Sequence, residues 1–267
     1  ATLASIVKYP YASAAATRKG KFGFFCTEKD IFRRIADEMG IICLSEPGEP
    51  LRYARHPLVY LVEAADDICY EIMDLEDAHK LKILSLDETM ALMLDFFCDD
   101  DRRRILQRID DEGLTDANEK IVYLRSCVIG LLERECVNAF VGAEDQILNG
   151  TFTGSLIDHI APLPAEAYRR CQQLSVSRIY RSQPVLDVEL SGYKIMQTLM
   201  EQFTEAAIHP ERFYSQQLIA RVSSQYDIQH PDLEARLMAV IDYISGMTDV
   251  YALDVYQKIN GTSLPIV

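Results

Sequence analysis

The sequence predicts an all-α protein built as a bundle of many helices, with at most one short hairpin near residues 176–190. Three features of the 267-residue chain predict this class. Apolar residues recur at intervals of three and four along most of the chain, as they do on one face of an α-helix. Start and stop signals for helices bracket these stretches. With 49% hydrophobic residues, the chain can also bury a sizeable core.

The first half of the chain contains the clearest helix signals. Thr27, followed by acids, and Gly40 bracket one helix. Another begins at Pro57, because proline is tolerated in the first turn. Ser85 with Glu88 three residues later forms a capping box before a third. The face of the second helix that is expected to be buried comprises Leu58, Leu61, Val62, Ala65, Cys69 and Ile72.

The middle of the chain is also expected to be helical. Three aspartates and three arginines at residues 99–104 are interpreted as the solvated start of a helix rather than a phosphate site. Residues 118–148 have the spacing of one long helix. A weak break follows near residues 149–164, where glycines and prolines gather.

The last third contains the one place where strands are expected. Ile179, Val185 and Val188, with Pro184 among them, favour a hairpin near residues 176–190. Helical spacing resumes after Gly192 and continues to the end of the chain. No segment of residues 1–267 has a linker signal clear enough to mark a boundary between independently folding domains.

Composition excludes several classes of protein. The net charge of −14 argues against a broad basic face for duplex nucleic acid, although it leaves nucleotides and a local single-stranded site open. No apolar run approaches the roughly 20 residues of a membrane span, and no signal peptide opens the chain, so we expect no membrane partner. Seven cysteines without a CxxC pair are typical of reduced thiols, which indicates a cytoplasmic protein.

One helix combines apolar residues with acids in a pattern that predicts a site. Asp66, Tyr70 and Asp74 follow at i, i+4 and i+8, which places them along one flank beside the apolar positions. A carboxylate beside apolar surface is costly to desolvate unless a cation, a metal or hydrogen-bond donors meet it. We therefore interpret these acids as members of a site rather than as a solvated face. The next residue, Asp67, projects from the helix about 100° away from Asp66 around the helix axis.

Residues 55–77, with this flank at their centre, closely resemble a signature segment of the HD-domain deoxynucleoside triphosphate triphosphohydrolases, the dGTPase-like family. Residues 8–10 with 21–29, and residues 242–249, resemble two further segments of that family. The resemblance implies an HD-domain-like helical bundle, a homo-oligomer, and metal-dependent hydrolysis of a dNTP substrate. The dNTP expected is dGTP above all, and the products would be the deoxynucleoside and inorganic triphosphate.

The resemblance also implies roles for individual residues. Asp66 would be the last ligand of a divalent metal (Mn, Mg, Fe or Ni), with Asp67 as the weaker candidate. Tyr70 would stack on the sugar, and Asp74 would accept a hydrogen bond from its 3′-hydroxyl. The residues expected to contact the triphosphate are Lys8, Tyr9 and Lys29. Weaker candidates for lining the pocket are Tyr180, Glu189, Asp249 and Tyr251.

The family's metal site also requires a His and a His-Asp pair, and none of the five histidines here is followed by Asp. We therefore expect the chain to be the C-terminal portion of a longer enzyme, inactive alone and unable by itself to hold the metal. Two functions remain open at this point. One is the nucleotide-binding part of a dNTP triphosphohydrolase, and the other is a catalytically inactive helical module for regulation or interaction.

Overall fold

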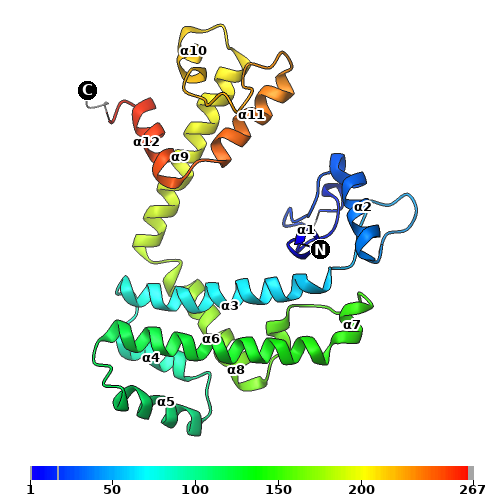
Figure 1. Ribbon diagram of the computed structural model, residues 1–267. Helices are drawn as coiled ribbons and strands as arrows, with labels where there is room; N and C mark the ends of the chain where they lie inside the picture. The colour runs from blue at the N-terminus through cyan, green and yellow to red at the C-terminus, as the bar shows by residue number, and fades with distance from the viewer. Residues whose placement is uncertain (1, 17, 264–267) are drawn as a thin grey trace. The chain divides into compact units, whose positions relative to one another are not determined.

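The computed structural model describes residues 2–16 and 18–263 (Figure 1). Within these residues the protein consists of helices and a few isolated β-bridges, without a β-sheet, so the all-α prediction is confirmed. The chain divides into two compact units, Ala1–Tyr180 and Arg181–Val267. The weak break near residues 149–164 falls inside the first unit.

The first unit begins with a small layer of helices and loops that has its own core. Its elements are α1 (Thr2–Ser5), the 3-10 turns η1 (Ser13–Ala15) and η2 (Cys26–Glu28), and α2 (Lys29–Met39). Phe24 stacks on Phe32 with ring centroids 4.2 Å apart, and Tyr53 packs against the same ring. Gly40 ends α2 in the left-handed conformation with φ of 66°, as its position in the sequence predicts.

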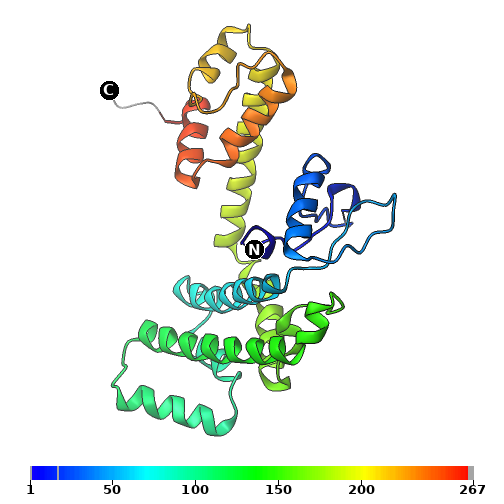
Figure 2. The ribbon, with the colours of Figure 1, turned by 45° about the vertical axis from the view of Figure 1, so that its right-hand side comes forward.

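The rest of the first unit is a helical body around two long helices. Its elements are α3 (Pro57–Lys80), α4 (Leu86–Leu94), α5 (Asp99–Asp111), α6 (Ala117–Gly142), α7 (Glu144–Leu148), the 3-10 turn η3 (Leu156–His159), α8 (Pro162–Leu174) and the π-helical turn η4 (Ser175–Ile179). Helices α3 and α6 lie side by side (Figures 1 and 2). The side chains sealed between the helices include Ile72, Leu75, Ile121, Leu124 and Leu132.

Two predictions about this body can be compared directly with the structure. The capping box at Ser85 is confirmed: Ser85 Oγ accepts from the Glu88 amide at 3.2 Å, and Glu88 Oε2 accepts from the Ser85 amide at 2.9 Å. The single long helix predicted over residues 118–148 is wrong at its end. Ala143 leaves helical geometry between α6 and α7.

The hairpin predicted near residues 176–190 is also wrong. Residues Ser175–Ile179 form the π-helical turn at the end of α8, and α9 begins at Gln183. Pro184, which lies within the predicted hairpin, occupies the first turn of α9, where its missing N–H has no helical partner to lose. Short apolar runs do not distinguish strand from helix by spacing alone, and here the helix prevails.

The second unit packs four helices around a core of its own. They are α9 (Gln183–Ile208), α10 (Phe213–Ile219), α11 (Leu233–Ser245) and α12 (Asp249–Ile259). The fully buried centre comprises Leu199, Phe203, Ala207, Val240 and Val255. Phe203 meets Tyr243 edge to face, with ring centroids 5.2 Å apart.

Within the described part of the chain, none of the helices combines the length and the apolar character that crossing a membrane requires.

Candidate functional site

Helix α3 carries the acids that the sequence singles out, and its start is held by local contacts. Pro57 opens the helix, and the His56 side chain caps it by accepting a hydrogen bond from the Leu58 amide at 3.2 Å. The face of α3 that faces the core contains Val59, Ile68, Ile72 and Leu75, none more than 2% exposed.

The buried face predicted for α3 is wrong at four of its six positions. Ile72 is buried and Leu61 packs against the core, but Leu58 and Val62 are 44% and 45% exposed, and Ala65 and Cys69 are exposed as well. The reason is that α3 has two apolar stripes, and the spacing does not say which of them packs against α6. The second stripe stays at the surface. We call it the α3 stripe, and it consists of Leu58, Val62, Ala65, Cys69 and Met73.

A shallow apolar groove of about 290 Å³ runs beside the α3 stripe. Ala65 and Cys69 line its α3 side, and Ile129, Cys136 and Val137 line its α6 side. Val137 is 53% exposed, so the uncovered apolar surface extends from α3 onto α6. An exposed apolar patch beside a polar flank is typical of a surface that binds another chain or a ligand.

The predicted polar flank of α3 adjoins this stripe. Asp66 is exposed, Tyr70 is 69% exposed, and Asp74 is half-buried. Asp67 is also half-buried, and burial raises the pKa of its carboxyl although the charge of Lys8 works to lower it. The flank therefore presents two carboxylates and an aromatic ring to solvent along two turns of one helix.

The structure adds Tyr180 to this flank from the end of the first unit. Tyr180 Oη donates a hydrogen bond to Asp74 Oδ2 at 2.5 Å, and burial together with the Asp74 carboxylate raises the pKa of the phenol. One turn earlier on α3, the buried Glu71 accepts from Ser175 Oγ at 2.9 Å. Burial raises the pKa of Glu71 as well. The sequence analysis did not identify Glu71 or Ser175. The one available signal was the position of Glu71 four residues after another acid of α3, Asp67.

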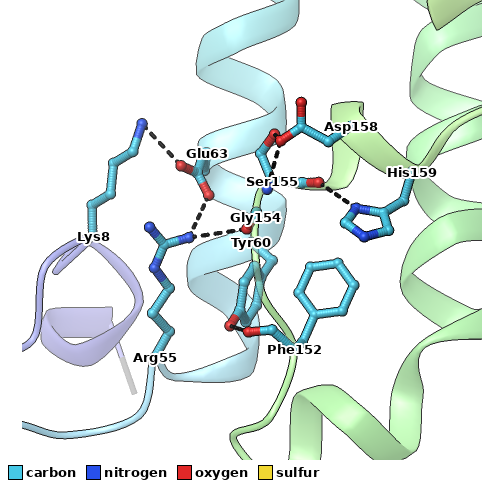
Figure 3. Close-up of polar contacts among 9 residues, drawn as sticks. All are labelled: Lys8, Arg55, Tyr60, Glu63, Phe152, Gly154, Ser155, Asp158 and His159. Atoms are coloured by element: carbon cyan, nitrogen blue, oxygen red, sulfur yellow. Dashed lines mark hydrogen bonds and ion pairs between the residues drawn. The ribbon is translucent and has the colours of Figure 1, made fainter.

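Lys8, predicted to contact a triphosphate, is engaged in an ion pair (Figure 3). Its Nζ lies 3.0 Å from Glu63 Oε1, and Arg55 Nη1 donates to Glu63 Oε2 at 2.8 Å. Burial works to lower the pKa of Lys8, but the hydrogen bond and the charge of Glu63 outweigh it, so that pKa is raised. Glu63 is only 8% exposed, and it joins the N-terminal layer to α3. The sequence reasoning did not single out Glu63.

The loop before η3 is fixed to the same end of α3 (Figure 3). Tyr60 Oη donates to the Phe152 carbonyl at 3.2 Å, and the two rings meet edge to face. Ser155 Oγ donates to Asp158 Oδ2 at 2.7 Å, which closes the first turn of η3. His159 lies against the Phe152 ring, with centroids 4.7 Å apart.

The other two residues predicted to contact the triphosphate lie in the N-terminal layer. The ring of Tyr9 has Lys21 Nζ at 6.0 Å from its centroid and packs near Tyr11. Lys29 is exposed at the first position of α2, where it lines a groove with Arg33. Among the described residues, no hydrogen bond or ion pair links Lys29 to Lys8.

Three weaker candidates belong to the second unit. Glu189 is exposed on α9, and Asp249 is exposed at the first position of α12. The hydroxyl of Tyr251 lies 3.1 Å from that of Tyr243. These three residues therefore belong to a different unit from the α3 flank.

The donor set for a metal is incomplete in this chain. Asp66 supplies carboxylate oxygens, but the described residues contain no group of three or more His, Cys, Asp or Glu side chains arranged to hold a metal ion. A transition metal held by a protein requires several such ligands at once. The residues described here do not by themselves fit a resident catalytic metal.

Comparison with known proteins supplies context for this site. Residues 160–258 match the phosphohydrolase-associated domain. The chain is 31% identical over 276 residues to a deoxyguanosinetriphosphate triphosphohydrolase-like protein of Pseudomonas aeruginosa, a match that covers 99% of this chain and 60% of the relative.

Two further relatives agree. A protein of the same description from Listeria monocytogenes is 31% identical over 292 residues, covering 98% of this chain and 60% of the relative. A deoxyguanosinetriphosphate triphosphohydrolase of Yersinia enterocolitica is 22% identical over 280 residues, covering 90% and 54%. The chain thus spans about 60% of the length of the first two relatives.

Proposed function

We propose that this chain, as a member of the deoxyguanosinetriphosphate triphosphohydrolase-like family, forms part of a hydrolase that cleaves a deoxynucleoside triphosphate. The products would be the deoxynucleoside and inorganic triphosphate, and dGTP is the preferred substrate. The observation that carries this proposal is the exposed flank of Asp66, Tyr70 and Asp74 beside an uncovered apolar stripe on α3.

The three residues of the flank have separate roles in this proposal. Tyr70 packs its exposed ring against the deoxyribose, where an aromatic face excludes water from one side of the sugar. Asp74 accepts a hydrogen bond from the sugar 3′-hydroxyl, and a charged acceptor makes this bond stronger than a neutral one. Asp66 serves as one ligand of a divalent metal, for which Mn, Mg, Fe and Ni are the candidates, with Asp67 as the alternative ligand.

The substrate's triphosphate is assigned to Tyr9 and Lys29, together with Lys8. Lys8 can serve only if it keeps its ion pair with Glu63 while its remaining N–H groups face the phosphates. The half-exposed state of the Lys8 side chain, at 37%, is compatible with this arrangement. Further residues proposed to contact the substrate are Tyr180, Glu189, Asp249 and Tyr251.

The remaining metal ligands must come from outside the residues of this chain. The α3 stripe supports this part of the proposal, because a complete site would cover the apolar surface next to Asp66 and thereby remove it from water. The part of the relatives that lies outside the match is the natural source of such a cover. We therefore expect the chain alone to be inactive, and the complete protein to act as a homo-oligomer.

The decisive experiment measures release of inorganic triphosphate from each of the four dNTPs with Mn²⁺. It compares this chain with the same chain extended by the coding sequence that precedes it in its gene. We expect activity in the extended form only, with dGTP turned over fastest. Turnover by the chain alone would contradict the incomplete site. Absence of activity in both forms, with helical structure intact, would favour a regulatory or interaction module instead.

Variants in the active form then test the residues. Asp66→Asn should abolish hydrolysis and leave the helical content unchanged. Asp77→Asn is the matched control, because Asp77 is an exposed acid on the same helix, 58% exposed and near Lys80. Asp67→Asn distinguishes the two neighbouring carboxylates. Full activity in the Asp66 variant would remove the ligand assignment.

A further inference from the structure

A second groove lies on a different part of the first unit, between α5 and α6. It has a volume of about 430 Å³, and three arginines line it: Arg104 and Arg108 from α5, and Arg134 from α6. Asp101 is the only acid among its lining residues. This local excess of positive charge stands in a chain whose net charge is −14, so it does not follow from composition.

The arginines of this groove keep hydrogen-bond donors available. Arg104 pairs with Asp101, and Arg108 Nε donates to Glu112 at 2.8 Å. Both partners lie three or four residues away on the same exposed helix, and pairs of this kind contribute only about 0–1 kcal/mol. A guanidinium carries five N–H donors, so each keeps several free. The guanidinium of Arg134 makes no hydrogen bond or ion pair with another described side chain or carbonyl, although its backbone is part of α6.

Helix α6 supplies the rest of the groove. Tyr123 and Ser126 contribute a phenol and a hydroxyl, both of which can donate to an anion. Gly130 lies between them and Arg134, and a Cβ built there would meet nothing nearer than Arg134 Nη1 at 3.6 Å. The floor of the groove is therefore free of a side chain at this point, which lets a ligand approach the backbone. Buried Phe97 closes one side.

We propose that the α5–α6 groove binds a phosphate chain, either inorganic polyphosphate or the phosphate tail of a nucleotide. Guanidinium groups match phosphate geometry with paired hydrogen bonds, and three of them from two facing helices can engage successive phosphates. The volume falls in the range of ordinary small-molecule sites. The groove shares no residue with the α3 flank, so this binding does not depend on the hydrolase function proposed above.

Calorimetric titration of the whole chain with inorganic triphosphate tests the proposal. We expect saturable binding that weakens on the order of tenfold in Arg134→Gln and again in Arg104→Gln, the loss typical of one charge-assisted hydrogen bond. Arg169→Gln is the control, because Arg169 is 60% exposed, pairs with Glu166 three residues away, and lies outside the groove. Equal affinity in all four proteins, or no saturable binding, would overturn the proposal.

A local readout guards against binding elsewhere on the chain. Cys127 lines the groove. Triphosphate should slow alkylation of Cys127 in the parent chain, as peptide mass spectrometry can measure, and Arg134→Gln should remove this protection. No slowing in the parent, or equal slowing in the variant, would contradict a ligand in this groove.

The two sources of the phosphate chain are separated by a third comparison. If each dNTP binds more tightly than inorganic triphosphate, and Tyr123→Leu removes the difference, the occupant is a nucleotide whose base or sugar lies on the Tyr123 ring. If the affinities are equal, the groove recognises the phosphates alone. Either result requires the arginines, and loss of the arginine dependence would contradict both.

Discussion

Tyr180 and Asp74 are 106 residues apart in the chain, and the phenol of the first donates to the carboxylate of the second at 2.5 Å. This bond fixes one oxygen of Asp74 and leaves the other, Oδ1, for a second donor. If Asp74 accepts from a sugar hydroxyl, as we propose, Tyr180 restricts the rotation of the carboxylate that does so.

Substitution of Tyr180 by Phe should therefore affect the orientation of the Asp74 side chain more than the stability of the folded chain. Tyr180 is 41% exposed, so we expect the free energy of unfolding to fall by at most about 1 kcal/mol. The Asp74 side chain should become more mobile, which NMR of its side-chain carboxyl carbon can follow. An unchanged Asp74 signal in Tyr180→Phe would show that the hydrogen bond does not form in solution.

Glu71 should make the stability depend on pH. Burial raises its pKa above the ordinary value of 4.5, so the folded state binds its proton more tightly than the unfolded state does. The stability linked to this group is fully present below pH 4.5, and it is lost as pH rises through the folded-state pKa.

Glu71→Gln removes the charge and keeps an acceptor for Ser175. We expect the variant to be more stable than the parent at pH 8, with the gap closing as pH falls toward 4. Urea unfolding at both pH values measures this gap. Glu112→Gln, an exposed residue on α5's end, serves as the control. A gap of constant size would contradict the raised pKa.

Glu63 should be more important for stability than the surface acids. Glu63→Gln removes the partner of both Lys8 and Arg55 from a site that is 8% exposed. Loss of charged hydrogen bonds there should cost about 1–3 kcal/mol in the free energy of unfolding. The exposed pair of Asp30 with Arg33 gives the comparison, since Asp30→Asn should cost less than about 1 kcal/mol. Equal losses would show that Glu63 is not a buried anchor.

Two valines one turn apart on α3 should behave differently. Val59 is 2% exposed, and Val62, in the α3 stripe, is 45% exposed. Val59→Ala should cost about 1.5–3 kcal/mol through lost burial and a small cavity. Val62→Ala should stay within about 0.5 kcal/mol in this chain. Chemical denaturation of the two variants compares them directly, and a large effect at Val62 would mean that the stripe is covered in solution.

The sequence was sufficient to predict the helices whose start and stop signals are local. Ser85 and Glu88 form the predicted cap, and Gly40 ends α2 as expected. The packed side of α3 was not predictable, since both of its stripes have helical spacing and the choice between them depends on what α6 presents. The π-helical turn at Ser175 was missed for a similar reason: short apolar runs with a proline fit a strand as well as a helix.

The polar contacts across the fold were the least predictable part. Glu63 meets Lys8 from 55 positions earlier, and Glu71 meets Ser175 from 104 positions later. No local pattern links such pairs, because the segments that carry them are brought together by the packing of the whole fold. The three arginines of the α5–α6 groove illustrate the same limit. The sequence places Arg104 at a solvated helix end, and Arg134 joins it only because α5 and α6 line the same groove.

The α3 stripe also has a calorimetric consequence. Leu58 and Val62 are already 44% and 45% exposed in the folded chain, so they add less to the heat capacity of unfolding than fully buried side chains of the same size do. A polypeptide that covers these side chains would remove their exposed surface from water when it binds. Binding would then show a negative heat-capacity change, whatever its enthalpy at a single temperature.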